Sequence, residues 1–321
     1  MNAPAVSGAH IIASGSRIHV DTAGRHGSPV LLLHGIGSSA ASFAGQLIGL
    51  ARQHRVMAWD APGYARSDDP KLPFRMDDFA DAAATVLTAL APGPAHVVGV
   101  SWGGVIATRL ALRHPGLVRS LVLADSTRGS GRTPEGAAAM RERVHELTRD
   151  GVHQFAHARA PRLLSARAPA SAVAAVRDVM AASVRLPGYA EAAASMADTD
   201  HTAALPGLKL PTLVLVGEHD QITGVEESRT VQRLVPDSRL TVIPGAGHLA
   251  NQERPDLFTA LVADFLAEQD GFLAQRDGFL AQRDGFLSEQ DGTAAGPATT
   301  ADAHQGDGPG PSTKEDPWTS D

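Results

Sequence analysis

The sequence AHVVGVSWGG at residues 95–104 decides the fold class of this chain. It opens with an apolar run typical of a buried strand, and the pattern G-x-S-x-G follows directly at residues 99–103. Glycines such as Gly99 and Gly103 allow a sharp turn from a strand into a helix, which presents the serine hydroxyl at the end of a sheet. A serine held on such a turn usually acts as a nucleophile, so Ser101 is the first candidate catalytic residue.

Strand and helix patterns alternate on both sides of this stretch. They predict a mostly parallel sheet covered by helices, which is an α/β fold. We expect a leading hairpin at residues 11–12 and 17–20, and further strands at 30–34, 55–59, 95–98, 117–124, 212–216 and 239–243. We expect helices at residues 40–52, at 76–90, after the serine turn as far as 114, at 225–234 and from about 255.

One long segment interrupts this alternation. Residues 127–205 are rich in alanine and arginine, have a helical period and contain no convincing strand. The sequence therefore predicts a core made of residues 1–126 and 206–270, with a helical insertion at 127–205.

A seven-residue repeat follows the predicted core. The sequence FLAEQDG at residues 265–271 recurs as FLAQRDG at 272–278 and 279–285 and as FLSEQDG at 286–292. Adjacent Phe and Leu and a glycine in every copy disfavour a coiled coil, so we interpret residues 271–292 as a tandem duplication of a helix end. The alternative is a ladder of Phe272, Phe279 and Phe286 for self-association. Residues 293–321, rich in Gly, Pro, Thr and Asp, are predicted to be a disordered tail.

The composition limits the function classes. With 321 residues, of which 43% are hydrophobic, the chain can bury a large core. The net charge of −7 argues against nucleic acid as a partner. The absence of cysteine excludes disulfides, thiolate catalysis and cysteine-ligated zinc. Without a leader pattern near the start or an apolar run of about 20 residues, we expect a cytoplasmic protein with no membrane partner.

Two downstream loops offer the partners that a serine nucleophile requires. His248 ends the glycine-rich sequence GAGH after the last predicted strand, which suits a general base. Asp220 ends the sequence GEHD directly after the strand at residues 212–216, which suits the acid that orients the base. Asp125, at the end of the strand at 117–124, is the alternative acid.

Acyl transfer also needs two backbone N–H groups that stabilise the oxyanion. We expect one from Trp102, directly after the serine, and the other from Ile36 in the loop of His34, Gly35 and Gly37. The alternative reading of that loop as a phosphate site lacks the lysine or the G-x-G-x-x-G pattern such sites use. We expect neither a cofactor nor a metal.

Together these motifs resemble the α/β-hydrolase family. The resemblance covers residues 20–266 and rests on residues 34–37, 60–67, 99–103, 217–220 and 245–248. It implies an eight-stranded, mostly parallel sheet and a helical cap over the active site, which corresponds to the insertion. Ala65 stands where the family usually has glycine.

Within the family, residues 187–189 and 247–255 are most similar to 3-oxoadipate enol-lactonase-like members. The insertion contains no tryptophan, whereas enol-lactonases tend to have one in the pocket.

The sequence thus favours a cofactor-independent serine hydrolase of a small carboxylic ester or (enol-)lactone. Two alternatives use the same triad: hydrolysis of a carbon–carbon bond of the meta-cleavage type, and peracid formation as a perhydrolase or haloperoxidase. A third, a ligand-binding receptor on a hydrolase scaffold, is disfavoured by the complete triad. Insertion arginines could pair with a substrate carboxylate, and the candidates are Arg128, Arg159, Arg162 and Arg185.

Overall fold

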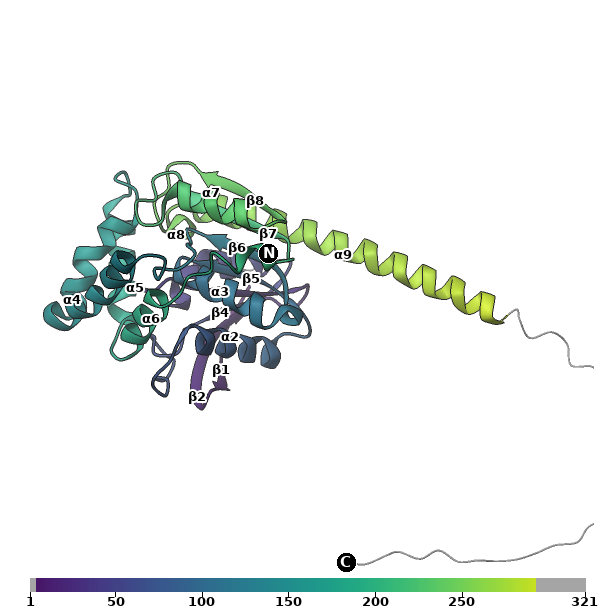
Figure 1. Cartoon of the computed structure of the whole chain (residues 1–321), viewed down its shortest axis with the longest axis horizontal. Helices are drawn as coiled ribbons and strands as arrows, with labels where there is room; N and C mark the ends of the chain where they lie inside the picture. Colours follow the sequence, from purple (N-terminus) through teal and green to yellow (C-terminus); the bar gives the residue numbers. More distant parts are fainter. Residues whose placement is uncertain (1–3, 293–321) are drawn as a thin grey trace, which may run out of the picture. The chain divides into compact units, whose positions relative to one another are not determined.

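The computed structural model describes residues 4–292. The chain divides into two units, Met1–Phe272 and Leu273–Asp321. The described part of the first unit contains an eight-stranded sheet (Figure 1). Its strands are β1 (Val6–Ala13), β2 (Ser16–Ala23), β3 (Pro29–Leu33), β4 (Arg55–Trp59), β5 (Ala95–Val100), β6 (Val118–Ala124), β7 (Thr212–Gly217) and β8 (Ser238–Ile243).

The strands lie in the order β1-β2-β4-β3-β5-β6-β7-β8. β2 pairs antiparallel with both β1 and β4, and the other neighbours pair parallel. The sheet is therefore mostly parallel, as predicted. Because β3, β5, β6, β7 and β8 run in the same direction, the loops that follow them meet at one edge of the sheet, and Ser101, Asp220 and His248 each lie after one of these strands.

Helices cover both faces of the sheet. They are α1 (Ala44–Leu50), α2 (Met76–Leu90), α3 (Trp102–Arg113), α7 (Gly224–Leu234), the short α8 (Ala250–Glu253) and α9 (Pro255–Gly292). Side chains of α2, α3 and α7 share one apolar core with Leu31 and Leu33, whereas side chains of α1 and the start of α9 share the other with Val30 and Leu32. Alternate residues of β3 thus face opposite layers, which explains why a central strand is apolar throughout.

Three further helices lie between β6 and β7, where the sequence predicts a helical insertion. They are α4 (Pro134–Arg159), α5 (Ala170–Ser183) and α6 (Gly188–Ala197), and we call them the cap. Figure 1 shows them gathered together in teal. The side chain of Thr133 caps α4 by accepting the Gly136 N–H, and α4 bends at Gly151, whose φ is +72°.

Helix α9 extends through the repeats. The sequence indicates a tandem duplication of a helix end at residues 271–292, and α9 continues through all four copies to Gly292. Every copy contains the strong helix formers Leu and Gln together with Glu or Arg, which offset one glycine every two turns. In the first copy Phe265 and Leu266 are buried, so that copy belongs to the core. The predicted tail at 293–321 lies outside the described residues.

The remaining predicted elements differ from the structure mainly at their ends. β4 and α2 have the predicted bounds, the leading hairpin is longer than predicted, and the helix expected at residues 40–52 begins as a 3-10 turn at Ala40–Phe43 before α1. Of the helices within residues 4–292, none combines the length and the apolarity that crossing a bilayer requires.

Candidate active site

Ser101 lies on the predicted turn, between β5 and α3. Its φ of +54° and ψ of −117° are strained for a residue with a side chain. A Cβ at Gly99 would lie 2.3 Å from the Gly103 carbonyl oxygen, and one at Gly103 would lie 2.0 Å from the Leu33 carbonyl oxygen. The turn therefore requires both glycines. The Ser126 hydroxyl donates to the Ser101 carbonyl at 2.8 Å and helps to hold the turn.

The structure brings Ser101, His248 and Asp220 together. The Ser101 Oγ lies 2.9 Å from His248 Nε2, and His248 Nδ1 lies 3.1 Å from both oxygens of the Asp220 carboxylate. The serine can donate to Nε2 while the Nδ1–H donates to the carboxylate, which is the arrangement a general base requires. His248 and Asp220 are both buried.

Several donors stabilise the Asp220 carboxylate. It accepts the backbone N–H groups of Ile222 and Thr223 and the Thr223 hydroxyl, besides the imidazole of His248. Burial alone would raise the pKa of Asp220, but the hydrogen bond from His248 and those from Thr223 and Ile222 lower it to about 2. The carboxylate is therefore ionised at neutral pH.

Asp125, the alternative acid, has other partners. Its carboxylate accepts the backbone N–H of Gly217 at 2.8 Å and that of Ala250 at 3.2 Å. It thereby ties the strand before Asp220 to the loop after His248. Burial, and next the neighbouring Asp220 charge, raise the pKa of Asp125 well above its usual value. The geometry therefore favours Asp220 as the partner of His248.

The loop after β3 has a fixed peptide orientation. The Gly35 carbonyl accepts the Ser38 N–H at 3.1 Å and lies 2.8 Å from His34 Nδ1. His34 Nε2 accepts the Ala61 N–H at 3.0 Å, so the proton of this buried, neutral imidazole is on Nδ1. In a trans peptide the N–H points away from the carbonyl, so the Ile36 N–H points away from these donors.

A second N–H group lies at the start of α3. Trp102 is the first residue of this helix, and the N–H groups of a first turn have no acceptor within their own helix. Ile36, Ser101 and Trp102 together line a cavity. The two residues whose N–H groups the sequence singled out therefore border the same cavity as the serine.

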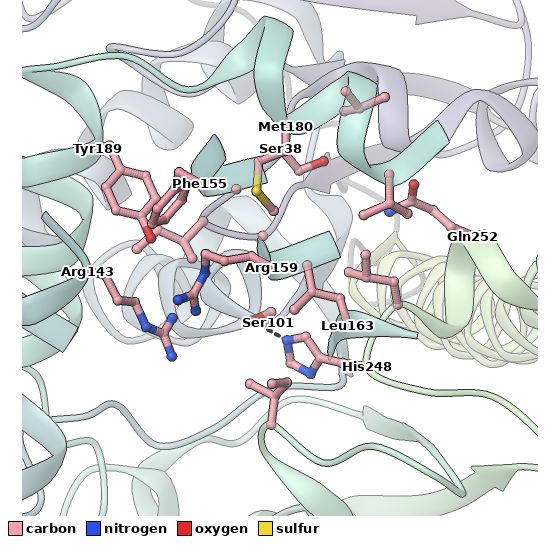
Figure 2. A pocket seen from close by; sticks show the side chains of 17 residues that line it. Ser38, Ser101, Arg143, Phe155, Arg159, Leu163, Met180, Tyr189, His248 and Gln252 are labelled. Atoms are coloured by element: carbon pink, nitrogen blue, oxygen red, sulfur yellow. Dashed lines mark hydrogen bonds between the residues drawn. The ribbon is translucent and has the colours of Figure 1, made fainter. Parts of the chain in front are cut away.

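A pocket opens above Ser101 and His248, with about 600 Å³ of space that is partly open to solvent. Figure 2 shows cap side chains forming its far walls. Its apolar lining comes from both cap and core and comprises Ile36, Phe155, Leu163, Val176, Val179, Met180, Ile222 and Leu249. A second, more polar cavity shares Ile36, Ser101, Arg143 and Ile222 with it, so more than one cavity borders the serine.

Of the four arginines singled out from the sequence, Arg159 lines this pocket. Arg128 pairs with Glu227, Arg185 pairs with Asp69, and Arg162 is exposed.

Sequence reasoning missed Arg143, which lines the pocket as well. The signal was its position on α4: Met140 and Leu147, three residues before it and four after it, are buried. An arginine on the apolar face of a helix points toward the interior.

Comparisons with known proteins identify the family of this chain. Residues 28–255 match the model of the family described as alpha/beta hydrolase fold. The chain is 34% identical to a 2-hydroxymuconate semialdehyde hydrolase of Pseudomonas sp. (strain CF600), over 84% of this chain and 98% of that protein. Among solved structures, a thermophilic esterase of Thermogutta terrifontis with malate bound has a TM-score of 0.75 and 29% identity, over 82% of this chain and 99% of that one. The enol-lactonase of Burkholderia xenovorans LB400 has a TM-score of 0.75 and 26% identity, over 81% of this chain and 100% of that one.

Proposed function

This chain belongs to the α/β-hydrolase fold family, and from that premise we propose that it hydrolyses a small carboxylic ester or lactone through a covalent acyl-enzyme. The observation that carries the proposal is the hydrogen-bonded chain from the Ser101 hydroxyl through His248 to Asp220 below a pocket. Ser101 is the nucleophile, His248 the general base and Asp220 the residue that orients the imidazole.

The first half of the reaction forms the acyl-enzyme. Ser101 Oγ attacks the substrate carbonyl carbon while His248 Nε2 takes the hydroxyl proton, and the Asp220 carboxylate stabilises the resulting imidazolium. The backbone N–H groups of Ile36 and Trp102 donate to the oxyanion, a contribution worth about 10²–10³ in rate for a single donor in a comparable site. The carbon–oxygen bond to the leaving alkoxide then breaks, and His248 returns the proton to that oxygen.

The second half regenerates the enzyme. A water molecule gives its proton to His248 and attacks the acyl carbon, and the bond to Ser101 Oγ breaks as His248 protonates the serine. In a lactone the alcohol remains attached to the acyl group, so the product is one hydroxy acid. The proposed chemistry uses only side chains and backbone amides and requires no cofactor.

The lining of the pocket supports a small substrate with a hydrocarbon portion. Aliphatic and aromatic side chains make up most of its walls, and the polar lining includes His248, Arg143 and Arg159. The esterase and the enol-lactonase among its structural neighbours bear names of this chemistry.

A second candidate is hydrolysis of a carbon–carbon bond in a ring-fission dienone. The observation that favours it is the 34% identity to a 2-hydroxymuconate semialdehyde hydrolase along nearly the whole of that protein. The same triad would serve both reactions, so the substrate distinguishes them.

Pre-steady-state kinetics test the proposal. With 4-nitrophenyl butyrate in excess, we expect a burst of 4-nitrophenolate equal to the enzyme concentration, followed by slower turnover. A fluorophosphonate should add one phosphonyl group to the protein, and peptide mass spectrometry should place it on Ser101. A burst without any label on Ser101 would refute the assigned nucleophile, and the lack of both burst and label would favour a ligand-binding receptor.

A substrate panel separates the two reactions. The ratio of kcat/KM for a simple ester or lactone to that for a ring-fission dienone should favour the ester or lactone. A preference for the dienone by more than about tenfold would replace ester hydrolysis with carbon–carbon hydrolysis while leaving the triad assignment intact.

A further inference from the structure

Two arginines of the cap share the pocket with Ser101. Arg143 and Arg159 both come from α4, one before and one after its bend at Gly151, and both line the cavity that contains Ser101 and His248. The side chain of Arg159 is only 14% exposed, and Arg143 is partly buried. Figure 2 draws their guanidinium groups next to each other. Burial lowers the pKa of Arg143, and the positive charge of Arg159 lowers it further.

The neighbours of this pair leave it with a net positive charge. Arg159 pairs with Glu146 at 3.3 Å and lies over the ring of Phe155, 5.2 Å from its centroid. Arg143 has the Tyr189 hydroxyl as a neighbour, and it makes no ion pair with a carboxylate among residues 4–275, whose side chains the structure describes. Two guanidinium groups therefore share one acidic partner, inside a pocket of a protein whose net charge is −7.

Other arginines of the same helix show that this arrangement is unusual. Arg141 pairs with Asp198 and Arg149 pairs with Asp150, and both of these arginines are more than half exposed. Like charges brought together away from water repel each other and lose hydration, which disfavours folding unless an anion compensates. A planar guanidinium matches a carboxylate with two parallel hydrogen bonds, so the missing partner fits a carboxylate well.

We propose that Arg143 and Arg159 bind a carboxylate of the substrate, so that the substrate is a small ester or lactone with a free carboxylate apart from its reacting carbonyl. This inference rests on the proposed function, because the carboxylate and the scissile bond belong to one molecule in one cavity. The apolar side chains of the lining suit the short hydrocarbon chain that would join the two groups.

Matched substrates test the inference kinetically. The acids are monomethyl esters of malonic to adipic acid, and each neutral control is the same ester with the free carboxyl replaced by a primary amide. The wild-type protein should favour at least one acid over its amide by tenfold or more in kcat/KM. The R143Q and R159Q variants should each reduce that preference about 10- to 100-fold, the range expected for losing a hydrogen bond to a charged group.

Two further variants provide controls. Glu146 competes for Arg159, so E146Q should leave the arginine free and increase the preference for the acid several-fold. R149Q, in which an exposed arginine of the same helix is neutralised, should leave the preference unchanged. E146Q keeps both arginines, so it remains informative if an arginine variant fails to fold.

A binding measurement separates this inference from the proposed reaction. Calorimetry with the S101A variant and glutarate should detect binding, which R143Q in the same background abolishes and glutaramide does not reproduce. If wild-type protein hydrolyses no ester of the panel but this pattern of binding holds, the proposed reaction fails and the carboxylate site stands. Equal preference for acid and amide in the wild-type, R143Q, R159Q and E146Q proteins, or glutarate binding unaffected by R143Q, would overturn the inference.

Discussion

The core and the cap contribute to the same pocket by different means. The core places Ser101, Asp220 and His248 on three short loops at strand ends, each fixed by backbone hydrogen bonds and close glycine contacts. The cap places Arg143 and Arg159 on the face of one long, bent helix. Fixed loops hold reacting atoms to within a fraction of an ångström, whereas a helix face presents long side chains that can differ between relatives without disturbing the chemistry.

This contrast predicts that variants of the core lower activity toward every substrate, whereas variants of the cap change the choice among substrates. The R143Q and R159Q variants test the prediction for the cap.

Replacing Ser101 with alanine should reduce turnover of any accepted ester by about 10⁶-fold, the loss seen for nucleophiles of comparable triads. The fold should persist, because alanine keeps the backbone of the turn. Activity assays with each substrate of the panel measure the turnover, and circular dichroism shows whether the fold persists. A variant that keeps more than a hundredth of wild-type turnover would contradict the role of Ser101, and unequal losses among substrates would weaken the separation between core and cap.

The Asp220→Asn variant should lower kcat by about 10⁴-fold, because an amide favours the wrong tautomer of His248. The Asp125→Asn variant should lower kcat far less per folded molecule. It should instead lower the free energy of unfolding by about 1–3 kcal/mol, since an amide satisfies the N–H groups of Gly217 and Ala250 poorly. Steady-state kinetics and urea unfolding of both variants decide between them, and a reversal of the two results would make Asp125 the catalytic acid.

These core assignments could be made from sequence because the chemistry there depends on local turns. Each site residue of the core follows a short apolar run and has glycines near it, and a turn that needs glycine leaves a visible pattern. The parallel direction of the strands then brings the loops together, although Ser101 lies 147 residues from His248 in the chain.

The cap arginines could not be assigned in the same way. Arg141, Arg143 and Arg149 lie on one helix, and their roles depend on which face of α4 packs against the pocket. The bend at Gly151 changes that face partway along, so a single helical period over α4 does not fix the direction of Arg159. The sequence also did not predict where α9 ends. Each repeat combines strong helix formers with one glycine, which is a poor helix former.

A buried histidine in the segment between α6 and β7 should make the free energy of unfolding depend on pH. His201 follows α6, is almost fully buried, and its ring nitrogens have no hydrogen-bond partner among the described residues. Burial, and next the charge of Arg109, lower the pKa of His201 to about 4. Because the unfolded chain binds this proton with a pKa near 6.5, the neutral imidazole contributes stability above about pH 6.5 that is lost as the pH falls toward 4.

The lost stability should amount to about 3 kcal/mol for His201 alone, at about 1.4 kcal/mol for each pKa unit. Urea unfolding at pH 7 and pH 4.5 measures it, and the His201→Gln variant should lose less stability between these two pH values than the wild type. The matched control is His157→Gln, on an exposed position of α4, which should follow the wild type. An unchanged pH dependence in His201→Gln would show that His201 is protonated in the folded protein.

The smallest effect is expected where a core loop contacts the cap. Ala65, at the position where the family usually has glycine, has a φ of +42°, and its N–H donates to the Ser183 carbonyl at the end of α5. A left-handed conformation disfavours any residue with a Cβ, so Ala65→Gly should raise the free energy of unfolding by about 0.5–1 kcal/mol, after allowance for the greater freedom of glycine in the unfolded chain. The opposite sign is expected for Ala138→Gly on the exposed face of α4, which should cost about 1 kcal/mol because glycine is a poor helix former. Both variants should keep the wild-type preference among esters. If Ala65→Gly changed that preference, the strained loop of the core would help to position the cap. Substrate choice would then depend on the contact between core and cap as well as on the cap itself.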